Sequence, residues 1–383
     1  MGKKKKRAYE RYFDYSLLFV TIFIVGFGLI MIYSTSSYTA QLEYGRADYY
    51  FRKQLFFVLG GLVCMYITYR MDYHKWRNWA LAIFIVSILL IIALIPFGSA
   101  ANGAKRWIRF GGVGIQPADI AKFAVIIMAS ASVCSMGKKM KKLRYVFKVC
   151  LLTAGILAAM VLVISNNMSS AIIIVGIAAV ITFVAYPGYR IYIAFVVLAV
   201  LALIPLKGIL TNYFSSGDMT QSFRFNRIMV WLDPEKYASG TGYQTVQALY
   251  AIGSGGLFGK GLGKSLQKLG FIPESQNDMI FSIICEELGL FGAICVILLF
   301  MIMLWRIVHI AQNAPDLFGS LVAVGVFAHI AIQVVLNIAV VTNFIPNTGV
   351  SLPIISYGGT SAIIIMTEIG IVLNISSKIR LEK

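Results

Sequence analysis

The chain has 383 residues, of which 59% are hydrophobic and only 13% are charged, and its mean hydropathy is +0.80. Soluble globular proteins carry about 25% charged residues, so this composition excludes a soluble enzyme. Apolar stretches recur along nearly the whole chain, which also excludes disorder and a domain tethered by one membrane helix. We predict an all-α fold, a polytopic membrane helical bundle that forms one domain over residues 1–383.

The net charge of +18 in a soluble protein would indicate a nucleic-acid ligand. In a membrane protein the positive-inside rule accounts for much of this excess, so we expect no nucleic acid as a partner. Five cysteines, an odd number, lie inside apolar stretches and predict buried thiols rather than a disulfide framework.

The basic start, Lys3–Arg7, precedes an apolar stretch at 15–36. That stretch has no small-residue cleavage site, so we predict an uncleaved first membrane helix rather than a signal peptide. Residues 1–14 are then a cytoplasmic tail.

Windows of about 17 to 25 apolar residues predict ten membrane helices. They lie near 15–36, 51–69, 78–97, 117–135, 146–164, 169–186, 190–206, 279–305, 318–341 and 359–376. An even number places both termini on the same side. The short basic connections, including Lys138–Arg144, Arg190, Arg306 and the Lys378–Lys383 tail, all fall on that side. The positive-inside rule makes it the cytoplasmic side of a multi-pass membrane protein.

A segment of about 70 residues, 207–278, separates helices seven and eight on the opposite face. Its aromatic and leucine content argues against disorder, so we predict a large folded extracytoplasmic loop. Cations remain there against the topological bias, and the loop before helix four adds more: Lys105, Arg106, Arg109, Lys207, Arg224, Arg227, Lys236, Lys260, Lys264 and Lys268. They indicate an anionic ligand, and contact with anionic lipid headgroups is the alternative.

Ionisable groups at membrane depth are costly and point to function. Asp119 and Lys122 share a helix face and either neutralise each other or leave Lys122 for a ligand. Glu286 and Glu287 point about 100° apart on one helix, so at least one faces the bundle, for packing or for chemistry. Glu368 is the third such position.

Asp278 stands where the long loop meets helix eight. A carboxylate at such a junction is partly desolvated yet accessible to a polar substrate, which raises its pKa toward the range of a general base. The alternative is that it only caps the helix N-terminus. The three histidines lack partners at ligand spacing, so we predict no metal centre.

Three stretches of the chain carry a family pattern. The first combines Asn102–Ile108 with Gln116–Lys122. The second runs through Trp231–Pro234, Gly242–Gln247, Gly261–Lys268, Pro273–Asp278 and Glu286–Gly289, and the third joins Pro346–Pro353 to Ile355–Gly359. Together they resemble the SEDS family of peptidoglycan polymerases, which contains FtsW, RodA and SpoVE, over essentially the whole chain. Three positions depart from the family pattern: Gln276-Asn277 stands where His-Thr is common, Asn167 replaces a usual acid, and Asp119 stands where Glu is common. The first and third changes keep the relevant chemistry, whereas the second removes an acid.

The resemblance implies a peptidoglycan glycosyltransferase that polymerises lipid II, an undecaprenyl-pyrophosphate-linked disaccharide-pentapeptide, on the outer membrane face. Asp278 is then the catalytic base. Expected substrate contacts are the cations, for the pyrophosphate, and polar residues that bind sugar or peptide or shape the cavity mouth: Lys105, Arg106, Gln116, Lys122, Arg224, Gln244, Gln247, Lys268, Glu274, Glu287, Thr348, Ser356, Tyr357 and Gly358. For Thr348 and Ser356–Gly358, a helix-breaking or packing role is the alternative.

Two other functions remain open at this point. Lys122, Glu287 and Glu368 would line the path of a lipid II flippase, although no inverted repeat is evident. A non-catalytic scaffold of a cell-wall synthesis complex is the third interpretation.

By the same resemblance, expected partners are lipid II, a class B penicillin-binding transpeptidase and other divisome or elongasome membrane proteins. The role lies in cell division, sporulation or cell shape, with Gly261–Lys268 closer to the division and sporulation branch. No organic cofactor is implied. A divalent cation at the pyrophosphate is compatible with the chemistry, and no ligand cluster for it is visible.

Overall fold

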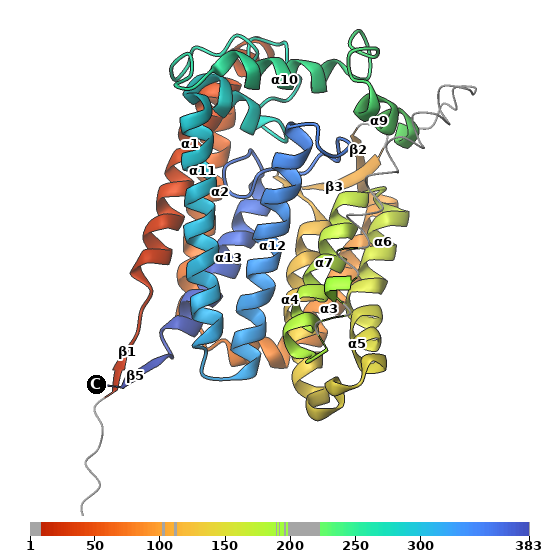
Figure 1. Cartoon of the computed structure of the whole chain (residues 1–383), viewed down its shortest axis with the longest axis vertical. Coiled ribbons are helices and arrows are strands. Elements are labelled where there is room, and N and C mark those ends of the chain that lie inside the picture. The colour runs from red at the N-terminus through yellow and green to blue at the C-terminus, as the bar shows by residue number, and fades with distance from the viewer. Residues whose placement is uncertain are drawn as a thin grey trace, which may run out of the picture.

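The computed structural model describes residues 9–101, 104–110, 113–188, 190, 192–194, 197 and 223–382. It is a bundle of long helices with a short sheet and two further helices at one end (Figure 1). This end, opposite the termini and including α9 and α10, is called the distal end below. The prediction of a helical membrane bundle is confirmed.

Nine described helical segments are long and apolar enough to cross a membrane. They are α1 (Tyr15–Tyr44), α2 (Tyr49–Arg70), α3 (His74–Phe97), α4 (Pro117–Met136), the α5 to α6 segment, α7 (Met168–Ala185), α11 (Ile280–Gln312), α12 (Leu317–Val341) and α13 (Gly359–Ser376). Within the α5 to α6 segment a π-helical turn, Cys150–Gly155, joins α5 (Leu143–Val149) to α6 (Ile156–Ile164). A 3₁₀ turn, Gly137–Lys141, precedes α5. Most of the predicted helix at 190–206 lies outside the described residues.

The N-terminal and C-terminal segments of the described chain lie side by side. Strand β1 (Tyr9–Arg11) pairs antiparallel with β5 (Arg380–Glu382). Beside them the buried Asp14 caps α1 by accepting from the Leu17 N–H at 2.8 Å. The same carboxylate pairs with Arg306 at 2.7 Å. The two ends therefore lie on one side of the bundle.

Close contact between α2 and α13 depends on glycine. A Cβ atom at Gly370 would lie 2.4 Å from the Met65 carbonyl oxygen, and one at Gly61 would lie 2.3 Å from the Met366 sulfur. Small residues let helix backbones approach in this way in membranes, where dispersion contacts replace the hydrophobic driving force. Helix α13 is thereby held in the middle of the bundle, and its N-terminus points to the distal end (Figure 1).

The connection before α4 is a sheet rather than the loop expected from the sequence. Strands β2 (Gly98–Ala101), β3 (Ala104–Phe110) and β4 (Val113–Ile115) form an antiparallel sheet in the order β2-β3-β4. Ser99 opposes Trp107, and Arg109 opposes Gly114. The sheet lies at the distal end, beside α9 (Phe223–Leu232) (Figure 1).

The described part of the predicted long loop, residues 223–278, is folded. It contains α9 and α10 (Tyr243–Gly255), and α10 lies across the distal end of the bundle (Figure 1). After α10 the backbone runs along α11, whose helical course is broken at Gly289, with φ of 67°. The broken turn pairs with the loop: Lys260 N–H donates to the Glu286 carbonyl and Gly261 N–H to the Glu287 carbonyl, both at 2.9 Å. In return Leu290 N–H donates to the Gly256 carbonyl at 2.9 Å and Phe291 N–H to that of Leu257 at 3.1 Å.

We predict that Gly289→Ala loosens this junction. The left-handed φ costs a residue with a Cβ about 1–3 kcal/mol, and the added Cβ would lie 2.4 Å from the Gly259 nitrogen. The variant in detergent should melt at a lower temperature and be cleaved faster by protease between residues 256 and 271. Gly26→Ala, in α1 with nothing within 4 Å of an added Cβ, is the control; equal behaviour of the two variants would contradict this account.

Candidate active site

Asp278 lies at the distal end, two residues before α11 begins at Ile280. Met279, not Asp278, occupies the N-cap position, and no side chain caps this helix. The helix-capping alternative is therefore wrong. The carboxylate faces the loop after α12, where a Cβ on Gly349 would lie 3.8 Å from Oδ2.

The surroundings of Asp278 raise its pKa above the ordinary value of an aspartic acid. Burial of the carboxyl, followed by the negative charge of Glu274, raises the pKa of Asp278 to about 6, against the opposing effect of Arg227. An acid with this pKa is ionised at neutral pH and still basic enough to accept a proton from a hydroxyl.

The positive charge of Arg227 acts on this acid, and Arg106 lies close enough to Arg227 to act on it in turn. Arg227 of α9 donates from Nη1 to the Asn347 carbonyl at 2.9 Å, and Arg106 of β3 donates from Nη2 to the Asn166 carbonyl at 3.3 Å. Burial lowers the pKa of both, and the charge of Arg106 lowers that of Arg227 further. Two partly desolvated guanidiniums that repel each other form a site that an anion would stabilise.

A cavity of about 440 Å³ opens beside these groups. Its lining is mostly amides and hydroxyls: Asn226, Arg227, Val230, Thr241, Gln244, Thr245 and Asn347. Gln244 bridges two segments, because its Nε2 donates to the Pro273 carbonyl at 3.3 Å and its Oε1 accepts from Asn347 at 3.5 Å. Such a surface suits a ligand rich in hydroxyl and amide groups.

Buried polar atoms without a protein partner gather around Asp278 in the described structure. They include Arg106 Nε, Asn277 Oδ1 and Thr348 Oγ1. Most buried polar atoms in proteins are hydrogen-bonded, so such atoms call for an explanation. Here they are available to a polar ligand. Of the predicted contacts, Gln244 lines the cavity beside Arg227, Thr348 precedes the Gly349 that faces Asp278, and the exposed Glu274 acts on Asp278 by its charge.

Other predicted contacts lie around this centre without facing the cavity. Lys105, exposed on β3, donates to the Ile95 carbonyl at 2.9 Å. Gln116 precedes α4, and its N–H donates to Thr360 Oγ1 at 3.5 Å. Gln247 lies on α10, three residues beyond Gln244, and is half-buried. The Arg224 side chain lies outside the described part of the structure.

Ser356, Tyr357 and Gly358 build the wall between the site and α13. Ser356 Oγ accepts from the Leu352 N–H at 2.8 Å, and Tyr357 N–H donates to the Gln276 carbonyl at 2.9 Å. Gly358 N–H donates to Gln54 Oε1 at 3.2 Å. These contacts agree with the packing role that the sequence left open.

Lys122 is corrected from a ligand contact to an ion-pair partner. It is buried and bonds Asp119 at 2.8 Å, which is the neutralising pair that the sequence offered as the alternative. Glu368 is paired as well, since both its oxygens lie within 3.0 Å of Nδ1 of the buried His329. Asn167, which replaces an acid, caps α7 by accepting from the Ser170 N–H at 3.1 Å.

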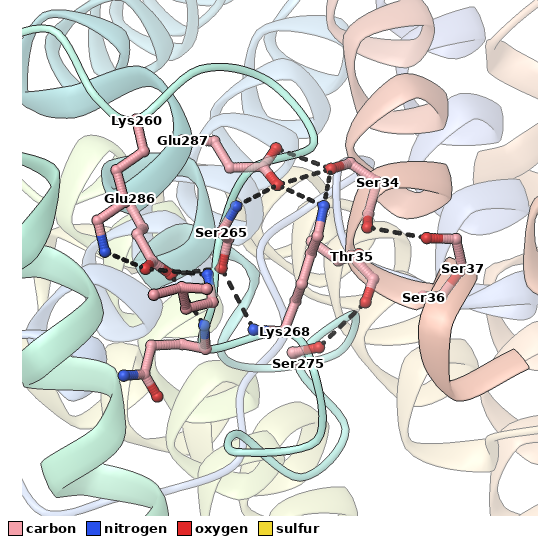
Figure 2. Close-up of polar contacts among 12 residues, drawn as sticks. Ser34, Thr35, Ser36, Ser37, Lys260, Ser265, Lys268, Ser275, Glu286 and Glu287 are labelled. Carbon is pink, nitrogen blue, oxygen red and sulfur yellow. Dashed lines mark hydrogen bonds and ion pairs between the residues drawn. The ribbon is translucent and has the colours of Figure 1, made fainter. Parts of the chain in front are cut away.

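Lys268 and Glu287 are corrected in the same way. Lys268 Nζ lies 2.8 Å from Glu287 Oε1 and 3.0 Å from Ser34 Oγ of α1, and both charged residues are almost fully buried (Figure 2). Their charges neutralise each other inside the protein, so they fasten the loop to α1 and α11 rather than face a ligand.

Glu286 fastens the same loop from the neighbouring position. It pairs with Lys260 at 2.7 Å, bonds Ser265, and accepts from the N–H groups of Leu266 and Gln267 at 3.2 and 3.3 Å (Figure 2). Neither glutamate faces lipid, and both serve packing.

Arg227, Asn347 and Asn226 belong to the site, although the sequence analysis named only Arg227, and only as one of many loop cations. These residues are visible in the sequence as polar residues in or beside the family motifs. The sequence does not show that they lie together in the structure. Within the described residues no group of three or more His, Cys, Asp or Glu could hold a metal ion, and a divalent cation stays a prediction.

The geometry can be compared with known proteins. A family model described as "Cell cycle protein", that of FtsW, RodA and SpoVE, matches residues 15–381. The chain belongs to the FtsW/RodA/SpoVE family. Stage V sporulation protein E of Bacillus subtilis is 38% identical over 367 residues, which cover 95% of this chain and 96% of that protein. The probable peptidoglycan glycosyltransferase FtsW of Trichlorobacter lovleyi is 37% identical, covering 96% of this chain and 94% of its own length.

Solved structures of this family share the fold. One, from work on the structural coordination of polymerization and crosslinking by a peptidoglycan synthase complex, matches with a TM-score of 0.74 at 22% identity, covering 95% of this chain and 97% of its own. The rod shape determining protein RodA of Thermus thermophilus matches with a TM-score of 0.65 at 22% identity, covering 95% and 96%. The bundle is therefore the FtsW/RodA/SpoVE fold of a multi-pass membrane protein.

We predict that Lys268→Ala and Glu287→Gln each destabilise the protein. Removing one partner of a buried ion pair leaves the other uncompensated, at a cost of about 3–5 kcal/mol. Both single variants should melt at lower temperature in detergent, whereas Lys268→Met combined with Glu287→Gln should recover part of the loss. Lys264→Ala, at an exposed position of the same loop, is the control. Unchanged melting of the single variants would show that the pair does not hold the loop.

Proposed function

We propose that this protein is a peptidoglycan glycosyltransferase that polymerises lipid II at the extracytoplasmic end of the bundle. Relatives at 37% and 35% identity carry the name probable peptidoglycan glycosyltransferase FtsW. The observation that carries the proposal is one acid, Asp278, with its pKa raised to about 6, beside two arginines and a cavity lined with amides and hydroxyls.

In this reaction Asp278 takes the proton from the 4-hydroxyl of the acceptor sugar. The hydroxyl oxygen forms a bond to the anomeric carbon of the donor from the face opposite the leaving group, so the configuration inverts. The bond from that carbon to the pyrophosphate oxygen breaks, and the electron pair leaves with the lipid pyrophosphate. Because this leaving group is already a stabilised anion, one base and cations suffice, unlike the two carboxylates of glycoside hydrolysis.

The cations have a defined task in this scheme. The charge of Arg227 acts on Asp278 and that of Arg106 acts on Arg227, and both cations would stabilise the charge that develops on the departing pyrophosphate. The amides of Gln244, Asn226 and Asn347 would bind sugar or peptide groups in the cavity. Lys122, Lys268 and Glu287 have no part in it, since each is committed to a buried ion pair.

The orientation rests on charge. The basic connections predicted to be cytoplasmic lie on the side of the termini, and the site lies at the distal end, which supports an extracytoplasmic site. For the partner we propose a class B penicillin-binding transpeptidase, along with other divisome or elongasome membrane proteins, supported by the fold shared with a peptidoglycan synthase complex. The relatives named for FtsW and for stage V sporulation favour a division or sporulation role.

The flippase alternative finds less support. Of its three candidate path residues, Lys122 and Glu287 are paired with the opposite charges of Asp119 and Lys268, and Glu368 is buried and hydrogen-bonded to His329. A polar path would need such groups to face water.

The test uses the purified full chain with its transpeptidase partner and labelled lipid II in detergent, where transport has no meaning. We expect long glycan strands with the unaltered chain and, for Asp278→Asn, a rate lower by at least about 100-fold, because general-base catalysis contributes about 10²–10⁴-fold. Glu274→Gln, which removes an exposed carboxylate four residues away, should still polymerise. Full activity of the Asp278→Asn variant would refute the assignment of the base.

The pH dependence provides a second test. A base works in its ionised form, so kcat/KM for lipid II, which reports the pKa of the free protein, should be half-maximal near pH 6 and fall about tenfold per pH unit below it. The negative charge of Glu274 raises the pKa of Asp278, so Glu274→Gln should move this acidic limb to lower pH. A limb that stays in place, or moves upward, would contradict the electrostatic account of the site.

A further inference from the structure

Helix α12 carries two buried amides facing the distal loops. Gln333 and Asn337 are four residues apart, and therefore share a helix face, and their side chains are 2% and 0% exposed. Gln333 Nε2 donates to the Ser351 carbonyl at 3.0 Å. Asn337 Nδ2 donates twice, to the Asp278 carbonyl at 2.8 Å and to the Val350 carbonyl at 2.7 Å.

The two carbonyls that Asn337 binds lie outside helices and strands, so no regular backbone hydrogen bond pairs with them. Asp278 precedes the first residue of α11, and Val350 follows Gly349, whose φ is +68°. Buried carbonyls outside helices need partners from side chains. One amide meets both needs and so ties three segments together: α12, the start of α11 and the loop after α12.

These segments define the surroundings of the acid. Gly349 lies against the Asp278 carboxylate, and Val350 is the next residue. Asn337 therefore holds the backbone from which the carboxylate projects and the wall that the carboxylate faces. Its own Oδ1 is buried without a hydrogen-bond partner in the described structure. A buried acceptor without a partner is unfavourable. The benefit of Asn337 must therefore come from its amino group, which binds the Asp278 and Val350 carbonyls.

We propose that Asn337 is a positioning residue of the glycosyl transfer, acting through Asp278 by fixing its backbone against the Gly349–Val350 wall. This inference rests on the proposed function, in which Asp278 is the base. Catalytic groups must be held close to their reactive geometry, and misplacement by about 1 Å can lower a rate about 100-fold.

The test replaces Asn337 with Leu, which has a similar shape and no donor, and separately with Ala in case either variant fails to fold. Asn374→Ala is the matched control. Asn374 is also a buried amide of the bundle, and it bonds the Tyr69 carbonyl and the Tyr73 N–H at the opposite end. Polymerisation by the full chain with its partner gives kcat and the KM for lipid II, and hydrogen exchange measures local opening.

We expect kcat of the Asn337 variants to fall about 10- to 100-fold with the KM nearly unchanged, and exchange to rise at 278–280 and 349–351. Asn374→Ala should lose thermal stability and keep its kcat. In the Asp278→Asn background, Asn337→Leu should cause little further loss, because the two act as one unit.

Two outcomes would overturn the inference. A normal kcat in folded Asn337 variants would show a structural role only, and unchanged exchange at both segments would show that Asn337 does not hold them. If Asp278→Asn is inactive while Asn337→Leu is fully active, this inference alone fails. If Asp278→Asn is itself active, the proposed base fails, and the inference fails with it.

Discussion

The constraint on which the distal half of this protein depends is that backbone polar groups in a membrane must find partners within the protein. Helix α11 breaks at Gly289, and that break would leave carbonyls and N–H groups unpaired. The loop after α10 supplies them through two donors and two acceptors between residues 256 and 261. The segment that leads to Asp278 is thus attached to α11 by main-chain bonds, before any side chain contributes.

Side chains then add to this attachment. Two glutamates on consecutive positions of α11 take a lysine each from the loop, and Ser34 ties the inner pair to α1 (Figure 2). Charge buried in this way contributes little net stability but is costly to disrupt, so it favours one arrangement over others. Beside this frame lie Arg227 and Arg106, whose positive charges disfavour each other, because burial and the charge of Arg106 both lower the pKa of Arg227.

The sequence predicted most of the fold, because membrane helices are set by local apolar length. The nine described spans agree with their predicted ranges to within a few residues, apart from the longer ends of α1 and α11. Asp278 was predicted because an acid at a helix boundary is conspicuous. Lys268 and Glu287 were misassigned because the two residues are 19 positions apart in the sequence. Their ion pair follows from the tertiary structure. Asn337 was missed because only ionisable residues in the spans were considered, although a buried amide at membrane depth carries the same kind of signal.

The order in which the chain is synthesised gives the bonds of Asn337 a further meaning. Ser34, the lysines and the glutamates that fasten the loop have all been made once α11 has left the ribosome. Asp278 is then already placed in the membrane protein, yet the amide that holds its carbonyl comes 59 residues later, and the Val350 carbonyl 13 residues after that. A nascent chain that stopped after α11 would carry Asp278 without these bonds, so the acid acquires its backbone partner only after α12 and the loop that follows it have been made.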